Sequence, residues 1–338
     1  MSVGNALLVS YRPDQAAYRY RMGYLPRALE QRGWNVRVEK LPSRRYVLRI
    51  LERRALWRWA DVVVFQKIKF SPLETALLRR YVKRRVFDLD DAIYLRRPRV
   101  PGGPAEFSRW RFHKFASTCR AMDAVVVGNP VLEAMARPYC PRVVVLPTTL
   151  DASRYQRRER PAGNGPTVVW VGNPENLDYL ELVRGALERL CARLPGLTLR
   201  IVSSAFPDWP RVRIERVPWS SEAETEALAT ADMGIMPLTD DDWARGKCAF
   251  KLLQYMAAGL PCIASPVGAN NQAVVDNVTG FLAANEAQWE TAIERLATDP
   301  ALARQLGAAG RHHLDAHYSL ERYLEGYERL LAELAGAP

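Results

Sequence analysis

The stretch RGKCAFKLLQYMAAGLPCIASPVGAN, residues 245–270, decides the prediction of the fold. It predicts a loop, a helix that begins near Cys248 or Ala249, and a short buried strand over residues 262–264. Gly259 suits the left-handed residue that ends many helices, and Pro261 prevents the helix from continuing. The stretch therefore passes from helix to strand through a sharp stop and then closes in a turn.

Three polar side chains lie on one face of this predicted helix, near its first turn. Lys251 follows Lys247 by four positions, and Gln254 follows Lys251 by three. A helix start carries unpaired N–H groups and a positive partial charge, so two lysines there would suit a phosphate or diphosphate. Two lysines that are merely solvated would show the same spacing, and the spacing alone does not decide between the two interpretations.

Residues 250–261, FKLLQYMAAGLP, resemble the donor-binding segment of GT-B glycosyltransferases of the GT4 type, a retaining family with the pattern S-K-x-x-E-Y-x-A-A-G-x-P-V. The resemblance implies that Lys251 contacts the diphosphate of a nucleotide sugar and that residue 254 holds the ribose hydroxyls. Gln254 departs from the family glutamate, and an amide lacks the strength of a charge-assisted hydrogen bond. The family's other glutamate would fall on Gly246. We therefore interpret the loop as specialised for anionic phosphate.

The rest of the chain alternates strands and helices, which predicts parallel sheets. With the resemblance, the expected fold class is α/β of the GT-B type, in which two Rossmann-like, doubly wound domains face each other across a cleft. The expected ranges are 1–155 for an acceptor-binding domain, 156–318 for a nucleotide-sugar-binding domain, and 319–338 for a terminal helix that packs back on the first domain. Residues 152–166 are expected to be the linker between them.

A group of carboxylates, Asp88, Asp90 and Asp91, follows a predicted strand in the first half. The carboxyl ends of strands in an open α/β sheet face the ligand crevice. The resemblance implies that Asp90 or Asp91 touches the transferred sugar. Two other interpretations stay open, a divalent-metal site and ion pairs with neighbouring arginines.

Arg19 and Arg21, within a predicted helix over residues 18–32, match a local R-x-R pattern of the family. They are expected either to be surface arginines or to contact an anion or the acceptor at the cleft. In the second half, the resemblance assigns donor binding to the loop after the first strand and to the strand end near residue 217. Together with the central stretch, the expected donor-binding residues are Gly172, Asn173, Val217, Trp219, Arg245, Lys247, Cys248, Phe250, Lys251 and Gln254. Of these, Lys247 and Lys251, together with Asp90 and Asp91, are expected to be catalytic.

Charge is distributed unevenly over the 338 residues. Residues 1–160 contain 33 lysines and arginines against 14 aspartates and glutamates, whereas the remainder contains 15 against 23. An anionic membrane surface, a lipid-linked phosphate or nucleic acid would each suit the basic half, and so would a solvated arginine-rich surface. No motif that reads RNA or DNA is present, so a nucleic-acid partner is not expected.

Five cysteines without a C-x-x-C spacing predict neither a disulfide scaffold nor a zinc site, and no metal or other cofactor is expected. The chain shows no secretory pattern and no apolar run of membrane-spanning length. We therefore expect a cytoplasmic protein, with peripheral contact to the inner face of the membrane as a further expectation. The expected function is metal-independent, retaining transfer of a sugar to a glycan, lipid-linked or other anionic acceptor. A catalytically degenerate partner subunit and a UDP-sugar epimerase are the alternatives.

Overall fold

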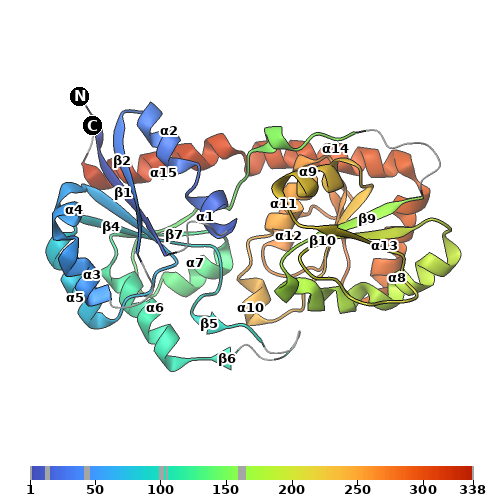
Figure 1. Cartoon of the computed structure of the whole chain (residues 1–338), viewed down its shortest axis with the longest axis horizontal. Coiled ribbons are helices and arrows are strands. Elements are labelled where there is room, and N and C mark those ends of the chain that lie inside the picture. Colours follow the sequence, from blue (N-terminus) through green and yellow to red (C-terminus); the bar gives the residue numbers. More distant parts are fainter. Residues whose placement is uncertain are drawn as a thin grey trace.

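The computed structural model describes residues 2–11, 16–41, 46–98, 103, 106–158 and 165–336. These residues form two lobes, each built on a six-stranded parallel sheet with helices on both faces (Figure 1). The strands of the N-terminal lobe are, in spatial order, β2 (Trp34–Lys40), β1 (Gly4–Ser10), β3 (Val62–Gln66), β4 (Arg84–Leu89), β7 (Ala124–Val127) and β8 (Val143–Val145). Those of the C-terminal lobe are β11 (Ile214–Pro218), β10 (Thr198–Ser203), β9 (Thr167–Val171), β12 (Met233–Met236), β13 (Cys262–Ala264) and β14 (Gly280–Leu282).

The strands are apolar along their length because both faces of each sheet are covered. In β1, Leu7 and Val9 face one hydrophobic cluster, whereas Ala6 and Leu8 face another on the opposite side. The predicted α/β class with two doubly wound sheets is confirmed. The domain boundaries at residues 155 and 318 stay predictions, and residues 159–164 of the expected linker lie outside the described residues.

The helices of the N-terminal lobe follow the predicted order. The helix expected over residues 18–32 is divided by a turn, because Pro26 lacks an N–H and fits only the first turn of a new helix. The helices are α1 (Ala16–Arg21), α2 (Leu25–Gln31), α3 (Tyr46–Glu52), α4 (Arg54–Trp59), α5 (Pro72–Tyr81), α6 (Arg109–Ala121) and α7 (Pro130–Ala136). A short antiparallel pair, β5 (Leu95–Arg96) and β6 (Glu106–Phe107), extends from the lobe (Figure 1).

The C-terminal lobe contains α8 (Glu181–Arg193), α9 (Ser221–Ala229), α10 (Asp242–Arg245), α11 (Phe250–Ala257), α12 (Asn270–Ala273), α13 (Glu286–Thr298) and α14 (Pro300–His317). Two 3₁₀ turns, η1 (Ala152–Arg154) and η2 (Pro174–Leu180), lie after the first lobe and after β9. The turn η2 leads directly into α8, which begins at Glu181.

The last helix, α15 (Leu320–Ala335), leaves the C-terminal lobe and lies along the N-terminal one, as predicted (Figure 1). Its apolar face, Tyr323, Tyr327, Leu330 and Leu331, joins the cluster formed by β1, β3 and α2. Gly336 ends it in the left-handed conformation, with φ of +73°. Among the described residues, no helix combines the length and the apolar content needed to cross a bilayer.

Candidate functional site

Helix α11 begins and ends as its sequence predicts. Gly259 has φ of +70°, which ends the helix before Pro261 and β13. At the other end Ala249 also has a left-handed backbone, with φ of +54°, although it is not a glycine. This conformation is costly for a residue with a Cβ and is often retained at functional sites. It places the loop of Lys247 and Cys248 beside the first turn of α11.

The two lysines of the predicted phosphate site come together, and neither ammonium has a hydrogen bond or ion pair with any residue that the structure describes. Both side chains are half-buried and lie against aromatic rings. Lys251 Nζ is 5.3 Å from the centre of the Trp170 ring, and Lys247 Nζ is 5.8 Å from that of Tyr179. Burial and then the neighbouring Lys247 lower the pKa of Lys251 to about 7. Burial likewise lowers the pKa of Lys247.

A third cation, Arg97, lies in the same region and was not singled out from the sequence. Its guanidinium carbon is 5.9 Å from the centre of the Tyr179 ring, and its positive charge contributes to the lowered pKa of both lysines. The nearest ion pair is a long one of 3.7 Å to the exposed Glu175. Arg97 directly follows β5, and residues 99–102 and 104 lie outside the described residues.

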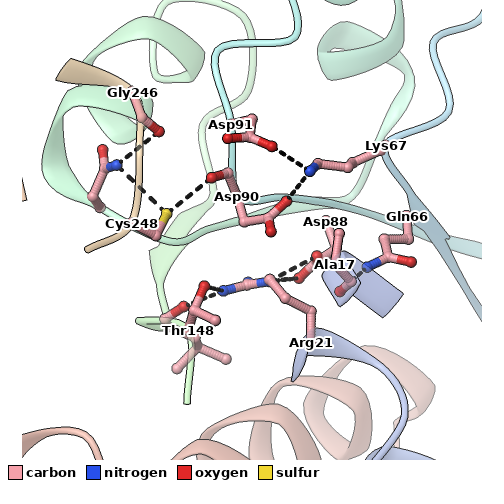
Figure 2. A network of polar contacts seen from close by, with 12 residues as sticks. Ala17, Arg21, Gln66, Lys67, Asp88, Asp90, Asp91, Thr148, Gly246 and Cys248 are labelled. Atoms are coloured by element: carbon pink, nitrogen blue, oxygen red, sulfur yellow. Dashed lines mark hydrogen bonds and ion pairs between the residues drawn. The ribbon is translucent and has the colours of Figure 1, made fainter. Parts of the chain in front are cut away.

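The carboxylates Asp90 and Asp91 lie at the carboxyl end of β4, where the sheet topology predicts a crevice, and both bind one lysine (Figure 2). Lys67 Nζ is 2.6 Å from Asp90 Oδ1 and 2.5 Å from Asp91 Oδ2. Burial would lower the pKa of Lys67, but the two carboxylates outweigh it and raise that pKa. The same ammonium, helped by Lys247, keeps the pKa of Asp91 below its usual value despite burial.

The ion-pair interpretation of these carboxylates therefore holds, with a lysine in place of the expected arginines. The Lys67 ammonium occupies the space between the two carboxylates that a divalent metal ion would need. Lys67 itself has a left-handed backbone, with φ of +54°, directly after β3. That conformation turns its side chain towards Asp90 and Asp91, a contact that no local sequence signal marks.

Arg21 does not contact an acceptor, and this expectation is wrong. Its side chain is fully buried and its donors are used inside the lobe, at 2.7 Å to Asp88 Oδ2 (Figure 2) and at 2.7 Å to the Leu146 carbonyl. Tyr327 of α15 also donates its hydroxyl to Asp88, and Tyr323 donates to the Arg21 carbonyl. Arg21 therefore holds the terminal helix against the N-terminal lobe.

Arg19, the other residue of the R-x-R pattern, points towards the opposite lobe. Its guanidinium carbon lies 5.3 Å from the centre of the Trp219 ring, and Trp219 is 44% exposed. Tyr20, between the two arginines, packs against Phe250 with ring centres 4.0 Å apart and ring planes tilted by 39°. Both contacts join α1 of one lobe to the donor side of the other, so Arg19 stays a predicted cleft residue.

Gln254 is buried, and its side-chain amide is hydrogen-bonded to two residues that are distant in the sequence. Its Nε2 donates to Glu224 Oε1 at 2.6 Å and to the Tyr155 hydroxyl at 3.3 Å. Trp219 Nε1 donates to the other oxygen, Glu224 Oε2, at 2.9 Å. Because both amide hydrogens are used, Gln254 can offer a ligand only its carbonyl oxygen. Glu224, a buried acid on α9, places a carboxylate beside the position where the family motif has one.

Of the other predicted donor residues, Gly172, Asn173 and Val217 lie near the carboxyl ends of their strands, whereas Arg245 is occupied by ion pairs. Gly172 lies beside Lys251, since a Cβ at Gly172 would be 2.6 Å from the Trp170 ring and 3.0 Å from Lys251 Cε. Asn173 is exposed and Val217 is half-buried on the same edge of the lobe. The guanidinium of Arg245 is instead held in ion pairs, with Asp240 at 2.7 Å and with Asp242 at 3.3 Å.

Comparisons with known proteins show what the chain is similar to. Residues 165–299 match the family model described as glycosyl transferases group 1. A curated glycogen synthase of Mycobacterium tuberculosis is 26% identical over 204 residues, which cover 56% of this chain and 48% of that protein. The chain thus spans about half the length of the curated relatives that it matches.

Solved structures match the whole chain at low sequence identity and establish the GT-B fold. Sucrose-phosphate synthase from Thermosynechococcus elongatus has a TM-score of 0.76 at 18% identity, covering 99% of this chain and 100% of that one. HepE of Anabaena, solved with UDP, has a TM-score of 0.71 at 13% identity, covering 97% and 100%. A glycosyltransferase from Rickettsia africae gives 0.69 at 13%, covering 98% of both chains.

Proposed function

We propose that the protein, whose residues 165–299 match the glycosyl transferases group 1 model within a GT-B fold, transfers a sugar from a nucleotide-diphosphate sugar to an acceptor. The observation that carries the proposal is the group of Lys247, Lys251 and Arg97. Three neighbouring cations, of which only Arg97 has an ion pair with a described residue, repel one another, and the nearby Asp91 offsets only part of that repulsion, so a further anion is favoured there. A diphosphate supplies that anion, and HepE, a protein of the same fold, was solved with UDP.

In the proposed reaction, negative charge accumulates on the diphosphate as the bond to the sugar breaks. Lys247 and Lys251 stabilise that charge, with the N–H groups at the start of α11. The cations are already in place, so they need little reorganisation when the bond breaks. We propose that these ammonium groups take the role of a metal ion and that the transfer retains the anomeric configuration.

The opposite wall of the site would hold the transferred sugar. Asp91 is ionised and fixed by Lys67, so its free carboxylate oxygen can accept a hydrogen bond from a sugar hydroxyl. Asp90 is buried more deeply, and burial raises its pKa. We therefore assign the sugar contact to Asp91 and a supporting role to Asp90.

A panel of UDP-, GDP-, ADP- and TDP-sugars, examined by thermal shift and calorimetry, tests the proposal. We expect one donor class to bind and to be consumed when an acceptor is added, with NMR showing the same anomeric configuration in donor and product. Binding of no member would identify the chain as a non-catalytic partner subunit. Inversion of configuration would contradict the retaining mechanism alone.

Donor affinity is expected to fall above pH 7. Lys251 has its pKa lowered to about 7 in the free protein, and a bound dianion raises that pKa. Below pH 7 the ammonium is already charged, so affinity is constant; above it, binding must also take up a proton, which costs about tenfold per pH unit. Calorimetry from pH 6 to 9 with a nucleotide sugar, whose diphosphate does not titrate in this range, measures the slope. Lys251→Arg should give a flat profile, and a flat wild-type profile would contradict the assignment.

An exchange of the acid and the amide between positions 224 and 254 tests how the nucleoside is held. Glu224→Gln removes the carboxylate that orients the Gln254 amide, and Gln254→Glu sets two carboxylates side by side. Each single variant should bind nucleotide about tenfold more weakly, which is the cost of one such hydrogen bond to a charged group. The double variant should recover most of the affinity. A double variant no better than the weaker single one would show that the two side chains do not act as a pair.

We further propose that the basic lobe approaches an anionic membrane surface or a lipid-linked acceptor through the start of α6. Phe107 and Trp110 are 60% and 59% exposed, and Lys114 Nζ lies 5.2 Å from the Trp110 ring. Exposed aromatic rings beside cations are typical of interfacial contacts. Phe107→Ser with Trp110→Ser should reduce co-sedimentation with anionic vesicles while nucleotide affinity stays unchanged. Equal sedimentation of wild type and variant would refute the contact.

A further inference from the structure

Asn129, which precedes α7 in the N-terminal lobe, bonds to both lobes at once. Its side chain is buried, with 1% exposed. The side-chain oxygen accepts the backbone N–H of Leu132 at 2.9 Å and so caps α7. The amide nitrogen crosses to the other lobe and donates to the carbonyls of Gly246 at 3.1 Å and Lys247 at 3.0 Å. One side chain therefore fixes a helix start and the loop of a proposed catalytic lysine.

The loop that Asn129 holds is in close contact with the N-terminal lobe. Cys248 Sγ donates to the Asp90 carbonyl at 3.1 Å (Figure 2). A Cβ at Gly128 would lie 2.3 Å from Cys248 Sγ, and one at Gly246 would lie 2.6 Å from the Cβ of Ala92. Gly246 has an ordinary φ of −77°, so this glycine is needed for space rather than for backbone conformation.

The two lysines are thus supported from different lobes. Lys251 stands on α11, and its stem lies against Gly172 and Trp170 of the C-terminal lobe. The backbone of Lys247 is bonded to Asn129 of the N-terminal lobe. We propose that Asn129 is a positioning residue that couples the closure of the two lobes to the assembly of the Lys247–Lys251 pair. The role in donor binding rests on the proposed function, whereas the coupling itself does not.

Asn129→Ser is the principal test, because serine also caps a helix but cannot reach the two carbonyls. Hydrogen exchange of the free protein should show faster exchange at residues 246–249, with the exchange of α7 unchanged. A displaced lysine should lower kcat/KM for the donor by about 10²-fold. Unchanged exchange in the loop would overturn the proposal.

The pH profile adds a readout that a purely structural role would not move. Lys251 is faced by Lys247 and Arg97, which lower its pKa, by Asp91, which raises it, and by the Trp170 ring. When the lobes separate, water enters and relieves the burial that lowers this pKa most, whereas Asp91 and Arg97, whose effects are opposite, both move away with the N-terminal lobe. The pH at which donor affinity begins to fall should therefore rise in Asn129→Ser. If the pH at which donor affinity begins to fall is the same in Asn129→Ser as in the wild type, the proposed coupling is contradicted.

A second variant separates the lobes without touching Asn129. Gly128→Ala places a methyl group against Cys248 Sγ, and adding Cys248→Ala removes the clash. The single variant should reproduce the faster exchange at residues 246–249, and the double variant should restore slow exchange. An effect of Gly128→Ala that Cys248→Ala does not relieve would contradict the proposed contact. If wild-type protein binds no nucleotide sugar, the proposed function fails, yet these exchange measurements still decide the coupling.

Discussion

Lys251→Ala is expected to lower sugar transfer by about 10²–10³-fold, the usual effect of removing one preorganised group that stabilises charge in a transition state. Nucleotide affinity should fall as well, because Lys251 faces the same diphosphate in the bound donor. Initial rates and calorimetry with the donor identified by the panel measure both effects. Lys83→Ala is the matched control, since Lys83 is exposed and pairs with Asp61 on the surface. Turnover should be unchanged in that control.

The same substitution should not destabilise the protein. Lys251 has no ion pair with a described residue, it lies beside the like charges of Lys247 and Arg97, and burial opposes its charge. Removing it relieves that repulsion, so the melting temperature should stay equal or rise, as occurs when a site is arranged for function rather than for stability. A marked drop in melting temperature together with the drop in transfer would indicate that Lys251 supports the fold, and the electrostatic role would then be wrong.

Local sequence features predicted the elements around α11 well. Gly259 and Pro261 act on the backbone of their own neighbourhood, so their effect does not depend on the rest of the chain. The close approach of Lys247 and Lys251 was predicted from helical spacing, but Lys247 lies in the loop before α11, and the left-handed backbone of Ala249 places that loop beside the first turn of the helix. Continuously apolar strands, each followed by a helix, also indicated both sheets, because a strand that is buried on two faces has to be apolar throughout.

Contacts between distant segments were not predictable in this way. Lys67, Arg97 and Glu224 acquire their roles only when other elements come near, and nothing in their neighbouring residues marks them. The R-x-R pattern illustrates the limit. Two residues separated by two positions point in nearly opposite directions on a helix, about 200° apart. Hence Arg19 and Arg21 cannot both face the cleft, and only the docking of α15 shows that Arg21 is the buried one.

Asp88→Ala is expected to destabilise the protein more than any of the other single substitutions. It leaves the guanidinium of Arg21 buried without its carboxylate, and breaking such a pair costs about 3–5 kcal/mol. Tyr327 loses its acceptor as well, so α15 should loosen from the N-terminal lobe. Thermal unfolding, with hydrogen exchange across residues 320–335, measures both consequences. Asp61→Ala, which breaks only the surface pair with Lys83, should cost at most about 1 kcal/mol.

The double variant Arg21→Met with Asp88→Leu separates two explanations of that loss. If the cost of Asp88→Ala arises from an uncompensated charge, two apolar side chains of similar size should restore most of the stability, because no buried charge remains. If the pair is needed instead to anchor the hydroxyl of Tyr327, the double variant should stay unstable and α15 should exchange as fast as in Asp88→Ala. Adding Tyr327→Phe removes the buried hydroxyl that has lost its carboxylate acceptor, so in that case it should restore slow exchange.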